Sequence, residues 1–216
     1  MVCGCDACPG RRDGRGPHRW CRRRSRCSDR RRGRRRPVYG RNRRRRLRRP
    51  RGAVVDAERL PFARDAFDAA TCRIAAHHFP NPTAFVNEAS RVLESGGTLA
   101  LEDNVAPPDP TLGEFINRVE RLRDPTHVES YTVEQWHEWL REAGFALEET
   151  VQLRKQLEFE SWADGQSCTG EERKRVERTL REATDEAAET FDIRVEDGRV
   201  VSFAPCKALI RARRLE

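Results

Sequence analysis

The first 52 residues contain no lysine, glutamate, isoleucine, phenylalanine or threonine. Their few apolar side chains never recur at the spacing of a helix or a strand, which excludes a hydrophobic core of their own. The whole chain also lacks an apolar run of about 18 residues and an apolar signal sequence, so we expect neither a membrane span nor export. Scattered cysteines at Cys72, Cys168 and Cys206 are typical of reduced thiols, and we therefore expect a cytoplasmic protein.

The net charge of +8 is an average over two unlike regions. Residues 1–52 hold 22 arginines and 3 aspartates, whereas residues 53–216 hold 21 basic and 32 acidic residues. This division predicts a low-complexity segment at residues 1–52 and a folded domain at residues 53–216. The acidic balance of the second region, with lysine only at Lys155, Lys174 and Lys207, is typical of halophilic proteins.

Three interpretations of residues 1–52 are open. The arginine runs at residues 31–36 and 41–49 would neutralise phosphates in a nucleic-acid-binding protein. The cysteines could hold zinc, but the spacing C-x-C-x2-C-x12-C-x5-C fits no paired C-x2-C pattern, so we assign no metal site. A GC-rich gene read in the wrong frame would give the same composition. We favour this last interpretation, which predicts a disordered segment without an evolved function.

Four short motifs follow one another within residues 54–103. D-A-E-x-L-P-F begins at Asp56, F-D at Phe67, H-H-F-P at His77, and R-V-L-x-x-G-G-x-L at Arg91. No single motif is specific, but their order resembles the central part of the class I S-adenosylmethionine-dependent methyltransferases of the UbiE-like type.

The resemblance implies an α/β, Rossmann-like methyltransferase sheet that closes with a C-terminal antiparallel hairpin. S-adenosylmethionine would be the cofactor and a small molecule the methyl acceptor, with nucleic-acid binding through the arginine-rich segment as the alternative function. The family's first strand and its G-x-G-x-G cofactor loop should lie upstream, and residues 1–52 contain neither. We therefore expect the N-terminal strands to be missing and the chain as written to be an inactive, partial domain.

Residues 53–55 form an apolar run that ends in an acid, which predicts a buried parallel strand with Asp56 at its carboxyl end. Ligands of open α/β sheets bind at that edge. In the resembled family, this acid accepts a hydrogen bond from the adenine amino group. The resemblance therefore implies Asp56, Ala57 and Glu58 as cofactor contacts, and a loop-capping aspartate is the alternative for Asp56.

Residues 67–76 predict the next strand, and the resemblance places its carboxyl end beside the methyl group and the substrate. Arg73 and Ile74 would contact the cofactor there. His77 would act as a base, because the ordinary pKa of histidine is about 6.5. Asp103 follows the next predicted strand at the same edge, where it could take a proton or merely turn the chain.

The motif R-D-P-T-H at residues 123–127 mixes a cation, a carboxylate and an imidazole between two predicted helices. Related sequences carry a similar motif, so His127 is a second candidate for the catalytic base. Arg73 or Arg123 could bind a carboxylate of the substrate. A salt-bridged turn stiffened by proline would show the same sequence.

The remaining patterns predict the helices and strands around this site. We expect a helix that Asn81 caps and that ends at Gly96-Gly97, capping boxes at Thr111 and Thr132, and one long helix over residues 170–190. Strands are expected at residues 98–102, 145–153, 191–196, 199–203 and 208–211, with Asp197-Gly198 as a two-residue hairpin turn.

Overall fold

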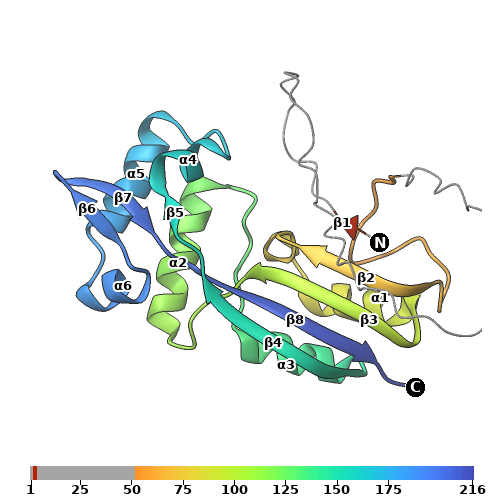
Figure 1. Cartoon of the computed structure of the whole chain (residues 1–216). Helices are drawn as coiled ribbons and strands as arrows, with labels where there is room; N and C mark the ends of the chain where they lie inside the picture. The colour runs from red at the N-terminus through yellow and green to blue at the C-terminus, as the bar shows by residue number, and fades with distance from the viewer. Residues whose placement is uncertain (1, 4–51) are drawn as a thin grey trace, which may run out of the picture. The chain divides into compact units, whose positions relative to one another are not determined.

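The structure is a computed structural model that describes residues 2–3 and 52–216. The three interpretations of residues 4–51, as a zinc site, an arginine-rich nucleic-acid site or a frame error, lie outside the described residues. No helix of the described part combines the length and the apolarity that a bilayer crossing requires. The elements are, in chain order (Figure 1), β1 (Val2–Cys3), β2 (Phe67–Arg73), the 3-10 turn η1 (Ala76–His78), α1 (Pro82–Val92), β3 (Leu93–Asn104), α2 (Pro110–Arg123), α3 (Val133–Glu142), β4 (Phe145–Arg154), β5 (Leu157–Glu158), α4 (Phe159–Asp164), α5 (Gly170–Arg181), α6 (Asp185–Thr190), β6 (Arg194–Glu196), β7 (Arg199–Phe203) and β8 (Cys206–Arg214).

The main sheet has the strand order β1-β2-β3-β8-β4. Strands β1, β2 and β3 are parallel, and β8 lies antiparallel between β3 and β4. This mixed sheet, with helices between its strands, confirms the predicted α/β, Rossmann-like class. The carboxyl ends of β2 and β3 meet at one edge, where ligands of such sheets bind.

The strand predicted at residues 53–55 is wrong, since these residues belong to no strand. A strand needs the backbone hydrogen bonds of a neighbour, and the outer side of β2 is paired with β1 instead, Val2 opposite Thr71 and Cys3 opposite Cys72. Strand β1 is therefore also an exception to the prediction that residues 1–52 lack structure. The strand predicted at residues 67–76 ends earlier, at Arg73.

Helix α1 begins where the sequence predicted, because Asn81 accepts a hydrogen bond from the N–H of Ala84. It ends at Val92 rather than at the glycine pair, since β3 begins directly afterwards. Gly96 has a φ of +78°, and a Cβ on Gly97 would lie 2.8 Å from the carbonyl oxygen of Glu94. The two glycines therefore bend the start of β3 instead of capping the helix.

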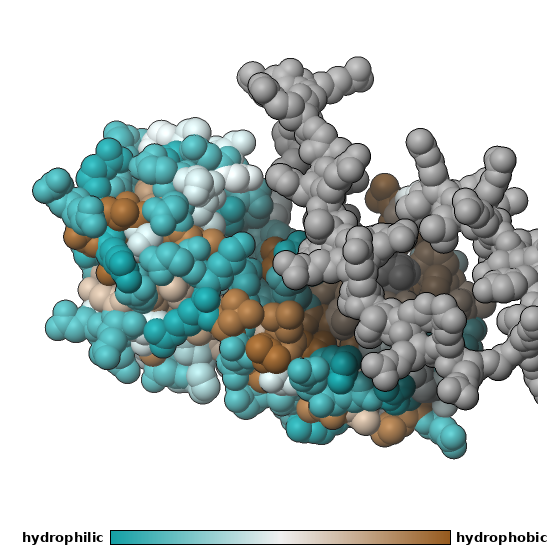
Figure 2. Space-filling view, viewed as in Figure 1, coloured by the Kyte–Doolittle hydropathy of each residue, from teal (hydrophilic) through white to brown (hydrophobic). Residues whose placement is uncertain are grey.

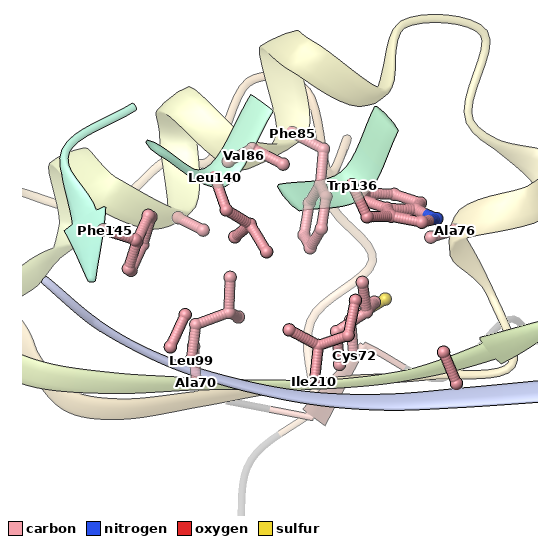
Figure 3. Packing of buried hydrophobic residues seen from close by; sticks show 14 of the residues in the cluster. Ala70, Cys72, Ala76, Phe85, Val86, Leu99, Trp136, Leu140, Phe145 and Ile210 are labelled. Atoms are coloured by element: carbon pink, nitrogen blue, oxygen red, sulfur yellow. The ribbon is translucent and has the colours of Figure 1, made fainter. Parts of the chain in front are cut away.

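Helices α1 and α3 cover one face of the main sheet, and the largest core lies between them and the strands (Figure 3). The buried residues of both helices recur at a spacing of three and four, which gives each helix one apolar face. Figure 3 shows the side chains of the strands pointing toward those of the helices; the labelled residues are Ala70, Cys72, Leu99 and Ile210 from the strands and Ala76, Phe85, Val86, Trp136, Leu140 and Phe145 around them.

A second core joins α2, α4, α5 and α6 to a small antiparallel sheet of order β5-β7-β6. The predicted Asp197-Gly198 turn does join β6 and β7, with φ of +49° and +76° at its two residues. The hairpin belongs to this small sheet, however, and the antiparallel pair that closes the main sheet is β8 with β4. This second core holds Leu112, Ile116, Val119, Phe159, Phe191 and Phe203.

Two helix predictions were wrong in detail. The single helix expected over residues 170–190 is broken into α5 and α6, because Thr184 accepts a hydrogen bond from the N–H of Ala187 and starts a new helix. Helix α2 has no capping box at Thr111, because Asp109 is its N-cap and Pro110 fills its first position. The capping box at Thr132 and Gln135 is confirmed.

Strand β4 changes the face that its apolar residues occupy. Its register with β8 shifts between Leu147 and Glu149, and such a shift changes the face on which the following side chains lie. Leu147 packs against the core, whereas Val151 and Leu153 are 44% and 40% exposed. Figure 2 shows the resulting apolar area over β4 and β8, and a groove of about 470 Å³ lies on this face, opposite to α1 and α3.

Candidate active site

Asp56 and its neighbours form a tight turn. Asp56 Oδ1 accepts a hydrogen bond from the N–H of Glu58 at 2.9 Å, and the Asp56 carbonyl accepts one from Arg59 N–H at 3.2 Å. This is the loop-capping arrangement, and it leaves Asp56 Oδ2 without a hydrogen bond among the described residues. Ala57 packs against the main core. The exposed carboxylate of Asp56 therefore keeps one oxygen for a ligand.

Glu58 contacts the start of α1, and its predicted cofactor contact stays a prediction. Its Oε1 accepts a hydrogen bond from the backbone N–H of Asn81 at 2.7 Å. Because Asn81 is the N-cap of α1, this bond ties the Asp56 turn to the start of that helix. The engaged carboxylate makes Glu58 a positioning residue for the turn.

Arg91 and Glu88 of α1 hold the loop that follows the Asp56 turn. Arg91 donates hydrogen bonds to the carbonyl oxygens of Leu60 at 2.9 Å and Phe62 at 2.8 Å. Glu88 accepts the Leu60 N–H at 2.7 Å and pairs with Arg91 at 2.7 Å. The hydrogen bond from Arg91 is the main cause that lowers the pKa of Glu88, against the opposing effect of burial. The motifs L-P-F and R-V-L are thus joined in space, which explains why they occur together.

The carboxyl end of β2 carries Arg73 and Ile74. Arg73 Nε forms an ion pair with Glu102 Oε2 at 2.7 Å, and its side chain is mostly exposed. Ile74 has a φ of +48°, a left-handed conformation that is strained for a β-branched residue. Its N–H donates to the Glu102 carbonyl at 2.7 Å, which holds the sharp turn in place. Strain of this kind occurs often at functional sites.

Asp103 lies at the end of β3, and its side chain is only 2% exposed. Its Oδ2 accepts the backbone N–H groups of Ala75 at 3.1 Å, Ala76 at 2.6 Å and His77 at 3.3 Å. Its Oδ1 accepts the Asn104 N–H at 2.7 Å and lies 2.5 Å from His77 Nδ1. Every partner of this carboxylate is a donor, so Asp103 fixes both the turn after β2 and the imidazole of His77.

The environment keeps Asp103 ionised. Burial raises the pKa of its carboxyl, but the hydrogen bond and the charge of His77, together with the N–H groups of Asn104 and Ala76, outweigh burial and lower that pKa. An ionised Asp103 selects the His77 tautomer that carries the proton on Nδ1, which leaves Nε2 to accept a proton. Asp103 thus lies beneath the imidazole of His77, which lines the cavity, and its catalytic role stays a prediction.

His127, the second predicted base, is buried. Its Nε2 lies 2.9 Å from Asn117 Oδ1, and Asn117 is itself oriented by the backbone of Ser130. Burial, followed by the charges of His77, His78 and Arg121, lowers the pKa of His127 to about 3. A neutral imidazole that donates from Nε2 is a poor base near neutral pH. Its ring stacks on His77 at 5.4 Å between ring centres, so His127 supports that ring.

The low pKa of His127 predicts a loss of stability in mild acid. Its folded pKa of about 3 lies below the unfolded value of about 6.5, so the stabilisation is complete above about pH 6.5 and is lost as the pH falls toward 3. Between about pH 7.5 and 5, this residue alone should lower the free energy of unfolding by about 2 kcal/mol.

Urea unfolding of the protein and of His127→Gln at both pH values tests this expectation. Glutamine can still donate to Asn117 but has no titrating group in this range, so the variant should lose about 2 kcal/mol less on acidification. His137 titrates in both proteins and cancels in the comparison. Equal losses would show that His127 is not held neutral.

A cavity of about 590 Å³ opens at the end of β2 and β3. Helix α2 and the segment around α4 form its far wall. His78 also lines it, 4.1 Å from His77 between ring centres, and donates from Nδ1 to the carbonyl oxygen of Thr126 at 2.9 Å. The wall consists of Ile74, His77, His78, Asn104, Glu120, Arg123, Asp124, Thr126, Lys155, Leu157, Trp162, Gln166 and Lys207.

Arg123 reaches the cavity but is already engaged, unlike the free carboxylate-binding group that the sequence suggested. Its guanidinium lies 4.5 Å from the centre of the Trp162 ring, and Nε donates to the Trp162 carbonyl at 2.9 Å. It also pairs with Glu120 at 3.4 Å, while burial raises the pKa of Glu120. Arg123 therefore fastens α2 to α4 over the cavity.

Sequence reasoning missed three charged residues of the cavity, Glu120, Lys155 and Lys207. Glu120 lies on α2, and no motif in the sequence marks it as a site residue. Lys207 precedes the strand predicted at residues 208–211, and β8 in fact begins at Cys206. The scarcity of lysine in this chain was the signal that could have found it.

A family model described as a methyltransferase domain matches residues 37–101. The chain is 36% identical over 156 residues to the Bacillus subtilis protein YcgJ, named as an uncharacterized methyltransferase, and this match covers 72% of the chain and 62% of YcgJ. It is 33% identical over 96 residues, 44% of the chain, to the 27-O-demethylrifamycin SV methyltransferase of Amycolatopsis mediterranei, and covers 35% of that enzyme. The chain thus spans less than two thirds of the length of these curated relatives.

Two solved structures resemble the fold over most of both chains. A Bacillus halodurans protein assigned as a methyltransferase has a TM-score of 0.73 and 43% sequence identity, over 75% of this chain and 76% of its own. The structure of YcgJ from Bacillus subtilis has a TM-score of 0.72 and 36% identity, over 74% of this chain and 69% of its own.

Proposed function

This chain belongs to the class I S-adenosylmethionine-dependent methyltransferases, and from that premise we propose that it methylates a small molecule held in the cavity beside His77. The cofactor of this enzyme family is S-adenosylmethionine. The observation that supports the proposal most is the pair of His77 and ionised Asp103 at the wall of a cavity at the carboxyl edge of the sheet.

The described residues fit the adenine half of the cofactor. The exposed carboxylate of Asp56 has one oxygen free to accept a hydrogen bond, and its other oxygen is fixed by Glu58 N–H, so the group is oriented in advance. Ala57 would lie beside the ring. Glu58 and Arg91 would act indirectly, because they hold the turn and the following loop on α1.

S-adenosylmethionine supplies an electrophilic methyl group on a sulfonium. The residues of this chain have to align an acceptor atom, take its proton and exclude water. His77 Nε2 would accept the proton of an acceptor hydroxyl or acidic carbon, and Asp103 would stabilise the resulting imidazolium. Ile74 and Arg73 would form the wall next to the cofactor, and helices α2 and α4 would cover the acceptor.

We also infer a cytoplasmic location, because Cys168 and Cys206 carry thiols rather than a disulfide. Burial raises the pKa of the Cys168 thiol, which keeps it protonated and unreactive. These two cysteines suit a reducing compartment.

Calorimetric titration with S-adenosylmethionine tests the cofactor assignment. Under this proposal the full chain should bind it, contrary to the inactive, partial domain that the missing glycine-rich loop led us to expect. Asp56→Ala should weaken binding about tenfold, because a hydrogen bond to a charged group is worth about 1.5 kcal/mol. Asp68→Ala, which removes an exposed aspartate of β2, is the matched control and should leave affinity unchanged. Absence of binding by the full chain would reject the proposed function, and equal binding by Asp56→Ala would reject only the role of Asp56.

A further inference from the structure

Two of the three lysines in the whole chain line the cavity beside His77. The chain otherwise uses arginine for its basic residues. The third lysine, Lys174, lies on α5 and forms an exposed ion pair with Glu171 at 2.6 Å. Lys155 and Lys207, by contrast, form no ion pair with the residues that the structure describes.

The pairing of β4 with β8 brings these two lysines to the same end of the main sheet. Leu153 lies opposite Lys207, and Arg154 lies opposite Cys206. The backbone N–H of Lys155 then donates to the carbonyl of Pro205 at 3.2 Å, which continues the pairing by one step. Lys155 is exposed at the cavity rim, whereas Lys207 is buried at 8% exposure.

The ammonium group of Lys207 is only partly satisfied. Its Nζ donates to Asn104 Oδ1 at 2.7 Å, and this is its one hydrogen bond among the described residues. Burial lowers the pKa of Lys207, the charge of Asp103 raises it, and the charge of Lys155 lowers it again. Glu102 and Glu120 also face this amine and raise its pKa. An anion between the two lysines would relieve their repulsion and fill the remaining donors of Lys207.

The other charges of the cavity are already used. Arg123 stacks on Trp162 and pairs with Glu120, and Arg73 pairs with Glu102 outside the cavity. Asp124 accepts hydrogen bonds from the N–H and the hydroxyl of Thr126. The two lysines are therefore the charged groups of this wall that remain open to a ligand.

The anion site is close to the base along β3. Asn104, which holds Lys207, directly follows Asp103, which holds His77. The strand register agrees, with Asn104 opposite Lys207 and Asp103 opposite Ala208. A ligand bound to the lysines would therefore extend toward His77 within one cavity.

We propose that Lys207 and Lys155 bind an acid group, a carboxylate or a phosphate, of the methyl acceptor and orient its reacting atom toward His77. This inference rests on the proposed function, because it names the acceptor class of the same cavity. The acceptor would be a small organic acid, which agrees with a cavity of about 590 Å³.

Titration of the full chain with benzoate and with phenyl phosphate, both without cofactor, tests this inference. Binding of either probe should weaken about tenfold in Lys207→Met and measurably in Lys155→Met, because a charge-assisted hydrogen bond is lost. Lys174→Met is the matched control and should bind like the unmodified chain. The probe that binds more tightly identifies the acid as a carboxylate or a phosphate.

The results separate this inference from the proposed function. Failure of both probes to bind, or equal binding by the unmodified chain and both cavity variants, would overturn it. Lys155→Met carries the test if Lys207→Met does not fold, since Lys155 is exposed and its loss removes no buried contact. A chain that binds the probes through these lysines but does not bind S-adenosylmethionine would reject the methyltransferase function alone.

Discussion

Asp103→Asn should lower the free energy of unfolding at neutral pH by about 3 kcal/mol. Its two carboxylate oxygens accept five hydrogen bonds, from the backbone of Ala75, Ala76, His77 and Asn104 and from the ring of His77. Asparagine has one oxygen and one NH₂, so its NH₂ must take the place of Oδ1 or Oδ2 and face N–H donors. The N–H groups at that position would lose their acceptor, and urea unfolding measures the resulting loss in the free energy of unfolding.

Asp109→Asn is the control for this substitution. Asp109 caps α2 through the N–H groups of Thr111 and Leu112 with a single oxygen, Oδ1. Asparagine is an equally good N-cap, so the change should stay within about 0.5 kcal/mol. If Asp103→Asn changed the free energy of unfolding as little as this control, the buried carboxylate would not be holding the turn after β2.

His77→Gln should reduce the turnover of methyl transfer by about 10² to 10⁴, the usual contribution of a general base. Glutamine can still donate to Asp103, so the fold and the cavity should be retained while the proton acceptor is lost. Steady-state kinetics with an organic acid that binds to Lys155 and Lys207 as the methyl acceptor would show the loss in kcat, with little change in KM.

The matched control is His137→Gln. His137 lies on α3, lies 2.8 Å from the hydroxyl of Thr150, and does not line the cavity. Burial lowers the pKa of His137, so the control removes a histidine from a partly buried site. A loss of kcat in His137→Gln equal to that in His77→Gln would assign the effect to general destabilisation rather than to the base.

Local chemistry made several elements predictable. Asn81 with Pro82, and Thr132 with Gln135, are helix starts whose hydrogen bonds form within a few residues. The Asp197-Gly198 turn depends only on two residues that tolerate a positive φ. The sequence could not assign that hairpin to the small sheet, because strand order depends on contacts between distant segments.

Long-range contacts also explain the wrong predictions. The run at residues 53–55 has the composition of a strand, but the outer side of β2 is taken by β1. The polar spacing of residues 170–190 fits one helix, yet the hydroxyl of Thr184 competes for the backbone and starts a second one.

The sequence predicted which residues lie at the site better than it predicted what each of them contacts. His77 and Asp103 were both expected at the carboxyl edge, but only the structure shows that the carboxylate is buried beneath the imidazole. His77 and His127 are both buried, and they differ in their partners, Asp103 for His77 and Asn117 for His127, which no local pattern reveals. Lys207 reaches the cavity because β8 pairs with β3 across more than a hundred residues of sequence.

The most direct test of the proposed site is a crystal structure of the full chain with S-adenosylhomocysteine. We expect the adenine beside Asp56 and Ala57, with the sulfur facing the cavity that His77 and Lys207 line. A nucleoside bound on the opposite face of the main sheet, or a sulfur that faces away from His77, would contradict it.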